Sequence, residues 1–486
     1  MNLLAGPAWT LLVNPTVDEV EWLGKALTVE EVDPGAYIKY KKHVFLRRDS
    51  YKFPTGLLSH VVAMASSQNA QVNIEWIHEA YNLPRVNPLP EAFGNGLTPR
   101  PYQVAITDAA VKAGRGIVKA ATASGKTGIM AMILHALGIP KSLVLVPSRS
   151  LVRQTREELE EWLGVEIGEL SAKRRILGPS VLVALVPSMA ARLQEPWCME
   201  ILRTRRALLL DECHHVRIGG IGTTSSGGQW FRIAQMCMAA VRFGFSATPL
   251  KPGDVLQNWR LTGATGPLLG EGISASALVE GGFAARPYIF YLKYSKPRIL
   301  YRMKYVEARD AGITRCGSRN GAILNAVKVC VAQGLKTLVL VEHVEHGKIL
   351  HEALELETGM ETRFLSGALD QDQQEAGLAW FKAPGPKVAV ATRILGEGTN
   401  IKDVDAVVLA CGGKSYVRIM QAMGRGMRKS GKAAMLFIDL DDRESHRYLR
   451  KHCEERRAHF SREASYRVAV EGQDLGEFIR VVFGNG

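Results

Sequence analysis

The chain lacks any long apolar run. No segment of its 486 residues approaches the roughly 18 consecutive apolar residues that a membrane-spanning helix needs. Residues 1–18 lack the basic start and the cleavage pattern of a secretory signal peptide. We therefore expect a soluble, intracellular protein that works in the cytoplasm and not in a membrane.

Paired cysteines are missing as well. The absence of any C-x-x-C pair argues against structural zinc and against a disulfide framework, and it fits a reducing compartment. His214 and His215 follow Cys213 directly, but adjacent residues do not share one face, so we expect no metal there. The seven cysteines are Cys198, Cys213, Cys237, Cys316, Cys330, Cys411 and Cys453.

Acidic residues are outnumbered by basic ones. The chain has 61 Lys and Arg against 48 Asp and Glu, which gives a formal net charge of +13. Such a surplus indicates a polyanionic partner, either nucleic acid or a membrane surface. The apolar fraction of 47% is that of a globular protein, and the length allows three domains of ordinary size.

Part of the positive charge is concentrated in residues 37–52, where basic residues alternate with aromatic ones. Strands of this composition can present a charged face to phosphates, and the alternative is a solvated hairpin with an ordinary core face. We take as candidate nucleic-acid contacts Lys41, Lys42, Arg47 and Arg48.

A second basic cluster lies in residues 443–462, at mostly helical spacing. Acidic residues are interspersed with the basic ones, so a salt-bridged solvent face and a DNA-contacting face both stay open. The basic members are Arg443, Arg447, Arg450, Lys451, Arg456, Arg457 and Arg462.

The sequence of residues 119–127, KAATASGKT, has the form of a phosphate-binding loop. An apolar strand at 116–120 precedes it and a helical stretch at 128–137 follows it, which is the context that such a loop needs. Backbone N–H groups would wrap the phosphates of ATP, Lys126 would reach the β- and γ-phosphates, and the Thr127 hydroxyl would ligate Mg²⁺. Ala120 replaces the usual first glycine. The candidate nucleotide-binding residues of the loop are Ser124, Gly125, Lys126 and Thr127.

A pair of carboxylates follows a second apolar strand. Residues 207–210 are all apolar, and Asp211 and Glu212 come directly after them. The pair would emerge at the carboxyl end of a buried strand, where α/β proteins place their chemistry. Asp211 would hold Mg²⁺, and Glu212 would act as general base on the hydrolytic water. A solvated acidic turn is the alternative, and the two motifs together disfavour it.

These two motifs resemble those of superfamily 2 helicases and translocases, and further motifs of that family follow in order. Ser246-Ala-Thr248 is similar to the motif that couples hydrolysis to strand movement, so the resemblance implies this role for Ser246 and Thr248. Residues 421–428 are similar to motif VI, which implies a catalytic role for Gln421 and arginine fingers at Arg425 and Arg428.

The resemblance extends over roughly residues 97–440. Residues 100–103 look like the adenine-reading segment, 147–149 like motif Ia, 337–342 like motif IV and 392–401 like motif V. The implied cofactor-binding residues outside the phosphate loop are Arg100, Gln103 and Gly398. The implied nucleic-acid contacts are Arg149, Ser188 and Thr392.

Three details are similar to one subgroup, the phage UvsW-type recombination helicases and their XPB-like relatives. They are the segment 53–58, the Asp-Glu-Cys-His form of the acidic motif, and the segment 408–415. Asn400 stands where the RNA-remodelling DEAD-box branch has an aspartate, which favours a DNA motor over an RNA motor. A phage-encoded protein would work in the cytoplasm of its host.

The motifs also predict the organisation of the chain. We expect an α/β fold with two RecA-like parallel-sheet lobes and a small N-terminal accessory domain that binds DNA. The predicted bounds are 1–88 for the accessory domain, 89–285 for the ATP-binding lobe and 286–486 for the second lobe. Predicted strands lie at 142–147, 181–185, 207–210, 337–341, 388–392, 406–410 and 434–439.

The resulting hypothesis is an ATP- and Mg²⁺-dependent DNA helicase that unwinds or branch-migrates forked and recombining DNA. The alternative is a motor that moves on duplex DNA without separating strands and serves a partner such as a nuclease. Because the predicted fingers belong to the second lobe, hydrolysis should require the lobes to close around ATP. The glycine-rich stretch 219–228 is expected to be a surface loop.

Overall fold

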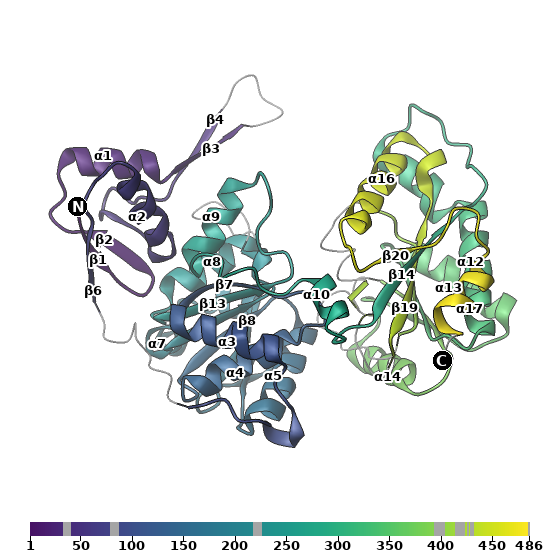
Figure 1. The fold of residues 1–486 in the computed structure, drawn as a ribbon, viewed down its shortest axis with the longest axis horizontal. Coiled ribbons are helices and arrows are strands. Elements are labelled where there is room, and N and C mark those ends of the chain that lie inside the picture. Colours follow the sequence, from purple (N-terminus) through teal and green to yellow (C-terminus); the bar gives the residue numbers. More distant parts are fainter. Residues whose placement is uncertain are drawn as a thin grey trace. The chain divides into compact units, whose positions relative to one another are not determined.

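The computed structural model describes residues 1–32, 40–77, 87–216, 226–392, 404–413, 423–424, 427 and 432–484. The chain forms two compact units (Figure 1). The first comprises Met1–Ala121 and Gly125–Ile273, and the second comprises Thr122–Ser124 and Ser274–Gly486. Each unit is built around its own parallel sheet.

The first unit begins with a small α/β module, residues 1–77, here called the N-terminal module. Its four-stranded sheet has the order β5-β2-β1-β6, and β3 and β4 pair with each other as a separate antiparallel ribbon. Leu23, Phe53 and Val61 form the centre of its core. Its elements are β1 (Asn2–Ala5), β2 (Trp9–Leu12), α1 (Val17–Ala26), β3 (Thr28–Val32), β4 (Tyr40–Val44), β5 (Lys52–Pro54), η1 (Thr55–Leu57), α2 (Leu58–Ser67) and β6 (Asn73–Trp76).

The rest of the first unit, here called lobe 1, is a seven-stranded sheet of order β10-β9-β11-β8-β12-β13-β7. All neighbouring strands are parallel except β9 and β10. The strands are β7 (Arg115–Lys119), β8 (Ser142–Val146), β9 (Gly168–Leu170), β10 (Arg175–Ile176), β11 (Val181–Leu185), β12 (Ala207–Asp211) and β13 (Val241–Ser246). The helices are η3 (Gly94–Gly96), α3 (Pro101–Ala113), α4 (Lys126–Ala136), α5 (Arg149–Leu163), α6 (Val186–Ala190), α7 (Pro196–Thr204), η4 (Cys213–His215), α8 (Ser226–Met236) and α9 (Val255–Ala264).

Both faces of this sheet are covered, because successive strand residues point to opposite faces. In β8, Val144 and Val146 pack with α4 and α5 on one face, whereas Leu143 and Leu145 pack with α6, α7 and α8 on the other. This burial on both faces explains why the strands are continuous apolar runs.

The N-terminal module packs directly on α9 of lobe 1. The rings of Phe45 and His60 lie 5.7 and 4.6 Å from the ring of Trp259 in that helix. Gly56 approaches the backbone so closely that a Cβ atom there would lie 1.8 Å from the carbonyl oxygen of Thr262. The N-terminal module and lobe 1 are therefore one compact unit.

The second unit, here called lobe 2, contains a seven-stranded sheet of order β16-β17-β15-β18-β19-β14-β20, parallel throughout. The strands are β14 (Arg286–Leu292), β15 (Thr337–Leu340), β16 (Thr362–Leu365), β17 (Val388–Ala391), β18 (Ala406–Leu409), β19 (Ala434–Leu440) and β20 (Arg467–Val468). The helices are α10 (Ala275–Glu280), α11 (Tyr305–Arg309), η5 (Asp310–Thr314), α12 (Gly317–Ala332), α13 (Val344–Thr358), α14 (Gln371–Lys382), η7 (Asp442–Glu444), α16 (Arg447–Ser461) and α17 (Leu475–Phe483).

The predicted fold class is confirmed: two parallel-sheet lobes and a small N-terminal module. The predicted domain bounds at 88 and 285 stay proposals. All seven cysteines are free. Among the described residues, no helix is both long and apolar enough to cross a membrane.

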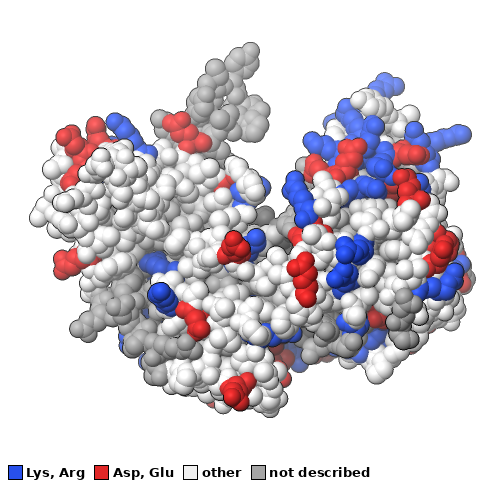
Figure 2. Space-filling view, viewed as in Figure 1, with Lys and Arg blue, Asp and Glu red and all other residues white. Residues whose placement is uncertain are grey.

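Charge is unevenly distributed over lobe 2. Figure 2 shows Lys and Arg side chains, with some acidic ones between them, gathered over the region of α16. On this helix Arg447, Arg450 and Lys451 are exposed. Arg456 is not, since it is fully buried.

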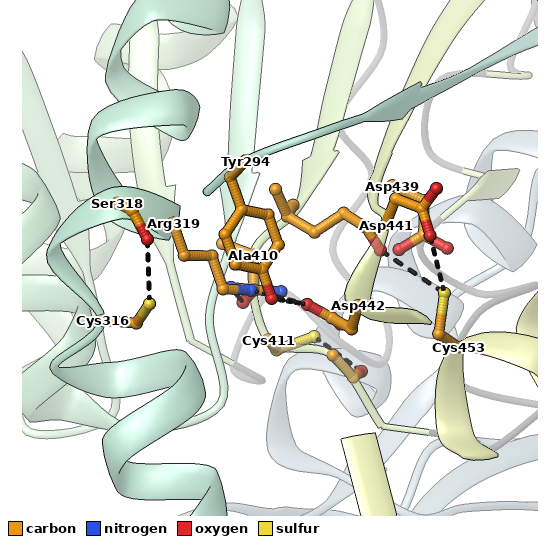
Figure 3. A network of polar contacts seen from close by, with 12 residues as sticks. Tyr294, Cys316, Ser318, Arg319, Ala410, Cys411, Asp439, Asp441, Asp442 and Cys453 are labelled. Carbon is orange, nitrogen blue, oxygen red and sulfur yellow. Dashed lines mark hydrogen bonds and ion pairs between the residues drawn. The ribbon is translucent and has the colours of Figure 1, made fainter. Parts of the chain in front are cut away.

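Arg456 belongs to a buried network of charges. Figure 3 labels four other members of this network, Tyr294, Arg319, Asp439 and Asp442. Its Nε donates to the two Asp439 oxygens at 3.0 and 2.9 Å, and its Nη2 donates to Asp442 at 3.1 Å. Arg319, also fully buried, donates to Asp442 at 3.0 Å, and the Tyr294 hydroxyl donates to the same carboxylate at 2.7 Å. Burial would raise the pKa of Asp442, but the two guanidinium groups outweigh it and hold that pKa below its usual value. Arg456 therefore lies neither on a salt-bridged solvent face nor on a DNA-contacting face, so both alternatives predicted for the second basic cluster are wrong for this residue.

The close approach at Gly56 generates a stability prediction. Replacing Gly56 with alanine should lower the midpoint of thermal unfolding, because the added methyl group must separate two backbone segments. Overpacking of this kind costs roughly 1–3 kcal/mol. Differential scanning calorimetry of the two proteins measures the shift.

Gly321→Ala in α12 is the matched control, since a Cβ atom there meets nothing within 4 Å. Alanine is the better helix former by roughly 0.5–1 kcal/mol, so this variant should melt at or above the wild-type midpoint. Equal midpoints for Gly56→Ala and wild type would contradict the packing argument.

Candidate functional site

The phosphate loop, residues 120–127, joins β7 to α4. Ala120 is fully buried and its N–H donates to the carbonyl of Ser246 at 2.9 Å, so the loop leaves the sheet beside β13. Its methyl group belongs to the core of lobe 1, which explains why a glycine is not needed there. Gly125 has φ 73° and ψ 50°, a left-handed conformation that turns the chain into α4. Lys126 and Thr127 are then the first two residues of that helix.

The two carboxylates lie at the carboxyl end of β12. Asp211 is the last residue of this fully buried strand. Glu212 follows with φ 48° and ψ 47°, a left-handed backbone that is costly for a residue with a side chain. The Lys126 ammonium forms a hydrogen-bonded ion pair with Glu212 and lies 3.9 Å from Asp211 Oδ1. The fold therefore brings together the loop lysine and both predicted carboxylates.

Burial and charge set the protonation states of this trio. Burial raises the pKa of Asp211 to about 6, against the attraction of Lys126. Burial would also raise the pKa of Glu212, but Lys126 and His214 outweigh it and hold that pKa below its usual range. The pKa of Lys126 is raised, because Glu212 and Asp211 outweigh the effect of its burial. Glu212 is consequently ionised at neutral pH and Lys126 is charged.

A histidine that sequence reasoning left without a role connects this trio to β13. His214 Nδ1 lies 3.3 Å from Glu212 Oε2 and 2.9 Å from Ser246 Oγ. The Thr248 N–H donates to Ser246 Oγ at 3.1 Å. Burial lowers the pKa of His214, so its ring is neutral at pH 7. The predicted coupling residues Ser246 and Thr248 are thus linked to Glu212 through His214, which the sequence marked only by its place beside Cys213.

Gln103 lies against the phosphate loop from the start of α3. Its side-chain oxygen accepts from the Arg100 N–H at 2.9 Å, and its Nε2 donates to the Gly125 carbonyl at 3.5 Å. Arg100 donates to the Tyr102 hydroxyl at 3.0 Å. Gln103 therefore contacts the backbone of the loop.

The predicted nucleic-acid contacts lie in three parts of the fold. Arg149 opens α5 after β8 and is exposed, and Ser188 lies in α6 after β11 and is buried. These adjacent strands end at the same edge of lobe 1. Thr392 follows β17 in lobe 2 and is buried.

The N-terminal candidates divide into two pairs. Arg47 and Arg48 are exposed, and the Arg47 guanidinium lies 4.6 Å from the centre of the Trp9 ring. Lys41 and Lys42 lie in β4, where the strand register places them opposite Glu31 and Glu30 of β3.

Several predicted residues fall outside the part of the chain that the structure describes. They are Gly398, Gln421, Arg425 and Arg428, and most of the 219–228 stretch.

Two family models match the chain. The model described as "Type III restriction enzyme, res subunit" matches residues 96–251, and the "Helicase conserved C-terminal domain" model matches residues 320–430. The first range contains the phosphate loop, the carboxylates and Ser246 with Thr248. The second contains the segments predicted to hold the fingers and motif V.

Named relatives share this two-part region. The chain is 27% identical over 348 residues to the protein named Rad25 in Halobacterium salinarum, covering 70% of this chain and 53% of that protein. It is 22% identical over 381 residues to "DNA 3'-5' translocase XPB2" of Sulfurisphaera tokodaii, covering 69% and 80%. It is 24% identical over 242 residues to "ATP-dependent DNA helicase uvsW" of Enterobacteria phage T4, covering 48% and 45%. The chain spans about half the length of the first of these relatives.

The buried trio generates a pH-dependent stability prediction. In Lys126→Met, two buried carboxylates lose the ammonium between them, which should cost about 3 kcal/mol at pH 8. Lys126 and His214 lower the pKa of Glu212, so its contribution is present above the ordinary value of 4.5 and is lost as pH falls through the lowered value. At pH 5 wild type still keeps Glu212 ionised, whereas in Lys126→Met burial raises the pKa of both carboxylates without opposition from the ammonium, so the variant can take up a proton there. The loss should therefore be smaller at pH 5 than at pH 8.

Thermal unfolding of wild type and variant at the two pH values, in metal-free buffer without nucleotide, measures this difference. Lys251→Met is the control, because the Lys251–Asp254 pair of lobe 1 is a surface pair at 3.2 Å and such pairs contribute little. A Lys126→Met loss of the same size at both pH values would rule out the assigned charges.

Proposed function

Because the chain belongs to the superfamily 2 helicases and translocases, we propose that it is an ATP-driven DNA helicase. It hydrolyses ATP at lobe 1 and uses the energy to unwind or branch-migrate forked and recombining DNA. The observation that carries this proposal is the contact of Lys126 with Glu212 and its continuation through His214 to Ser246.

The loop suits the triphosphate of ATP. Backbone N–H groups at the start of α4 and the Lys126 ammonium supply positive charge at one place. One ammonium cannot pair fully with two anions, so a phosphate bound at the loop would draw Lys126 away from Glu212. The effect of Lys126 on the pKa of Glu212 would then weaken, and the carboxylate would become a better base.

The residues present also fit a divalent cation. Asp211 offers a carboxylate and Thr127 a hydroxyl, and Mg²⁺ prefers such oxygen ligands together with water and phosphate. A cation would favour the ionised form of Asp211, whose pKa burial raises to about 6. We assign Thr127 and Asp211 as the residues that would hold Mg²⁺, which would neutralise phosphate charge there.

Glu212 is the proposed general base for the hydrolytic water. Its strained backbone directs the carboxylate to Lys126, and His214 holds the second carboxylate oxygen. A change at Glu212 during hydrolysis would reach Ser246 and Thr248 through His214. The proposed stabilisers of charge on the transferred phosphoryl group are Arg425 and Arg428, beside Gln421 in the same motif, with Gly398 near the nucleotide.

DNA is the proposed polyanion that balances the net charge of +13. Arg149 and Ser188 would contact the sugar–phosphate backbone from lobe 1, and Thr392 would do so from lobe 2. The N-terminal candidates Lys41, Lys42, Arg47 and Arg48 would contact the duplex arms. Contacts of this kind carry no sequence information, so binding should depend on salt and not on sequence.

Replacing Glu212 with glutamine should leave ATP binding in place and slow turnover by roughly 10²–10⁴-fold, because the amide cannot accept the proton. ATP binding is measured with a fluorescent nucleotide and turnover by phosphate release. Glu157→Gln, at an exposed residue of α5 paired with Arg153 at 2.9 Å, is the control and should hydrolyse ATP normally. Near-normal turnover in Glu212→Gln would remove Glu212 as the base.

The choice between helicase and translocase depends on the DNA substrate. ATP turnover should rise most with forked and four-way DNA, and labelled strands should be released or exchanged in the same reactions. Turnover that rises with plain duplex and releases no strand would favour the translocase, an activity that the name of the Sulfurisphaera relative also supports. Stimulation by RNA alone would contradict both.

A further inference from the structure

The segment after β14 is unusually rich in basic and aromatic residues. Residues 293–309 contain six Lys or Arg and three Tyr but a single acidic residue, Glu307. This segment lies outside the two ranges that the family models match, 96–251 and 320–430. Basic residues interleaved with aromatic ones are the pattern of surfaces that bind nucleic acid.

The segment is held in place by α16. The Tyr305 ring meets the rings of Tyr448 and His452 edge to face, at 5.9 and 5.3 Å. The Arg447 guanidinium lies 4.9 Å from the centre of the Tyr301 ring and 4.8 Å from that of Tyr448. Tyr301 is therefore positioned by its neighbours.

Tyr301 is nevertheless 69% exposed, and the adjacent Leu300 is exposed to the same extent. Four exposed cations lie on residues 293–309 and on α16: Arg302, Lys304, Arg447 and Lys451. In the described part of the chain, none of them forms an ion pair with a carboxylate. We name the set of Tyr301 and these four cations the Tyr301 surface. Two of its cations, Arg447 and Lys451, belong to α16, the helix over which Figure 2 shows basic side chains.

We propose that the Tyr301 surface binds single-stranded DNA. A base stacks on the Tyr301 ring, and the cations contact the flanking phosphates. The exposed ring selects a single strand over a duplex, because bases inside a duplex are already stacked and cannot reach it. The proposal rests on the proposed function only in taking DNA as the nucleic acid. It adds a contact that lies wholly within lobe 2 and is distinct from Thr392 and the N-terminal candidates.

The test compares variants of the full chain by fluorescence anisotropy with a labelled oligo-dT strand and a labelled duplex, without nucleotide. Tyr301→Ala should weaken binding to the single strand by roughly five- to tenfold or more, with little change for the duplex. Tyr301→Phe keeps the ring and should bind as wild type does. Because the side chain is exposed, neither substitution disturbs the core.

The charges are tested through the salt dependence of binding. Arg302→Ala/Lys304→Ala should give a shallower slope of affinity against salt, by about 0.7 for each lost phosphate contact on a single strand. The control Arg363→Ala/Lys382→Ala removes the same charge from exposed positions elsewhere on lobe 2 and should keep the wild-type slope.

Wild-type affinity in Tyr301→Ala would overturn the proposal, as would an equal loss for single strand and duplex. Binding of an RNA strand that is sensitive to Tyr301, with DNA binding that is not, would overturn the choice of DNA. DNA-stimulated ATP hydrolysis by the wild-type protein shows whether only the Tyr301 surface or also the proposed function is wrong. If wild type hydrolyses ATP in response to DNA while Tyr301→Ala binds the single strand normally, only the surface assignment is wrong.

Discussion

Both lobes depend on one constraint of parallel sheets: every strand ends at the same edge. In lobe 1 this edge collects the phosphate loop after β7, the carboxylates after β12 and Ser246 at the end of β13. These residues are far apart in the chain, and sheet order alone makes them neighbours. Because the strands are buried on both faces, the polar side chains of the site can emerge only where the strands end.

The same constraint gathers buried charge in each lobe, with different consequences. In lobe 1, Lys126 is shared between Asp211 and Glu212, and a bound anion can compete for it. In lobe 2, the charges of Arg456 and Arg319 are balanced by Asp439 and Asp442 within the protein, and the two arginines also hold the carbonyls of Gly413 and Ala410. The first arrangement suits a site that changes during a cycle, and the second suits a rigid support for the chain that leaves β18.

The sequence was most informative where a local pattern has one physical meaning. The strand at 181–185 was predicted with its observed bounds. Lys126, Asp211 and Glu212 were each predicted from a local motif, and the structure adds their contacts with one another, which neither motif showed. By contrast, helical spacing could not reveal that Arg456 is buried, since burial depends on carboxylates contributed by β19 and η7. The role of His214 and the position of Tyr301 likewise depend on partners distant in the chain, Ser246 and Arg447.

Gly56 has a consequence for how this protein can evolve. Its Cα lies against the backbone of Thr262, so no side chain of either residue mediates the approach and no substitution at Gly56 can be absorbed by a rotamer change. A lineage that exchanged the N-terminal module for an unrelated one would therefore inherit an α9 surface shaped for the old module. We expect glycine to be kept at position 56 wherever the N-terminal module and α9 stay together.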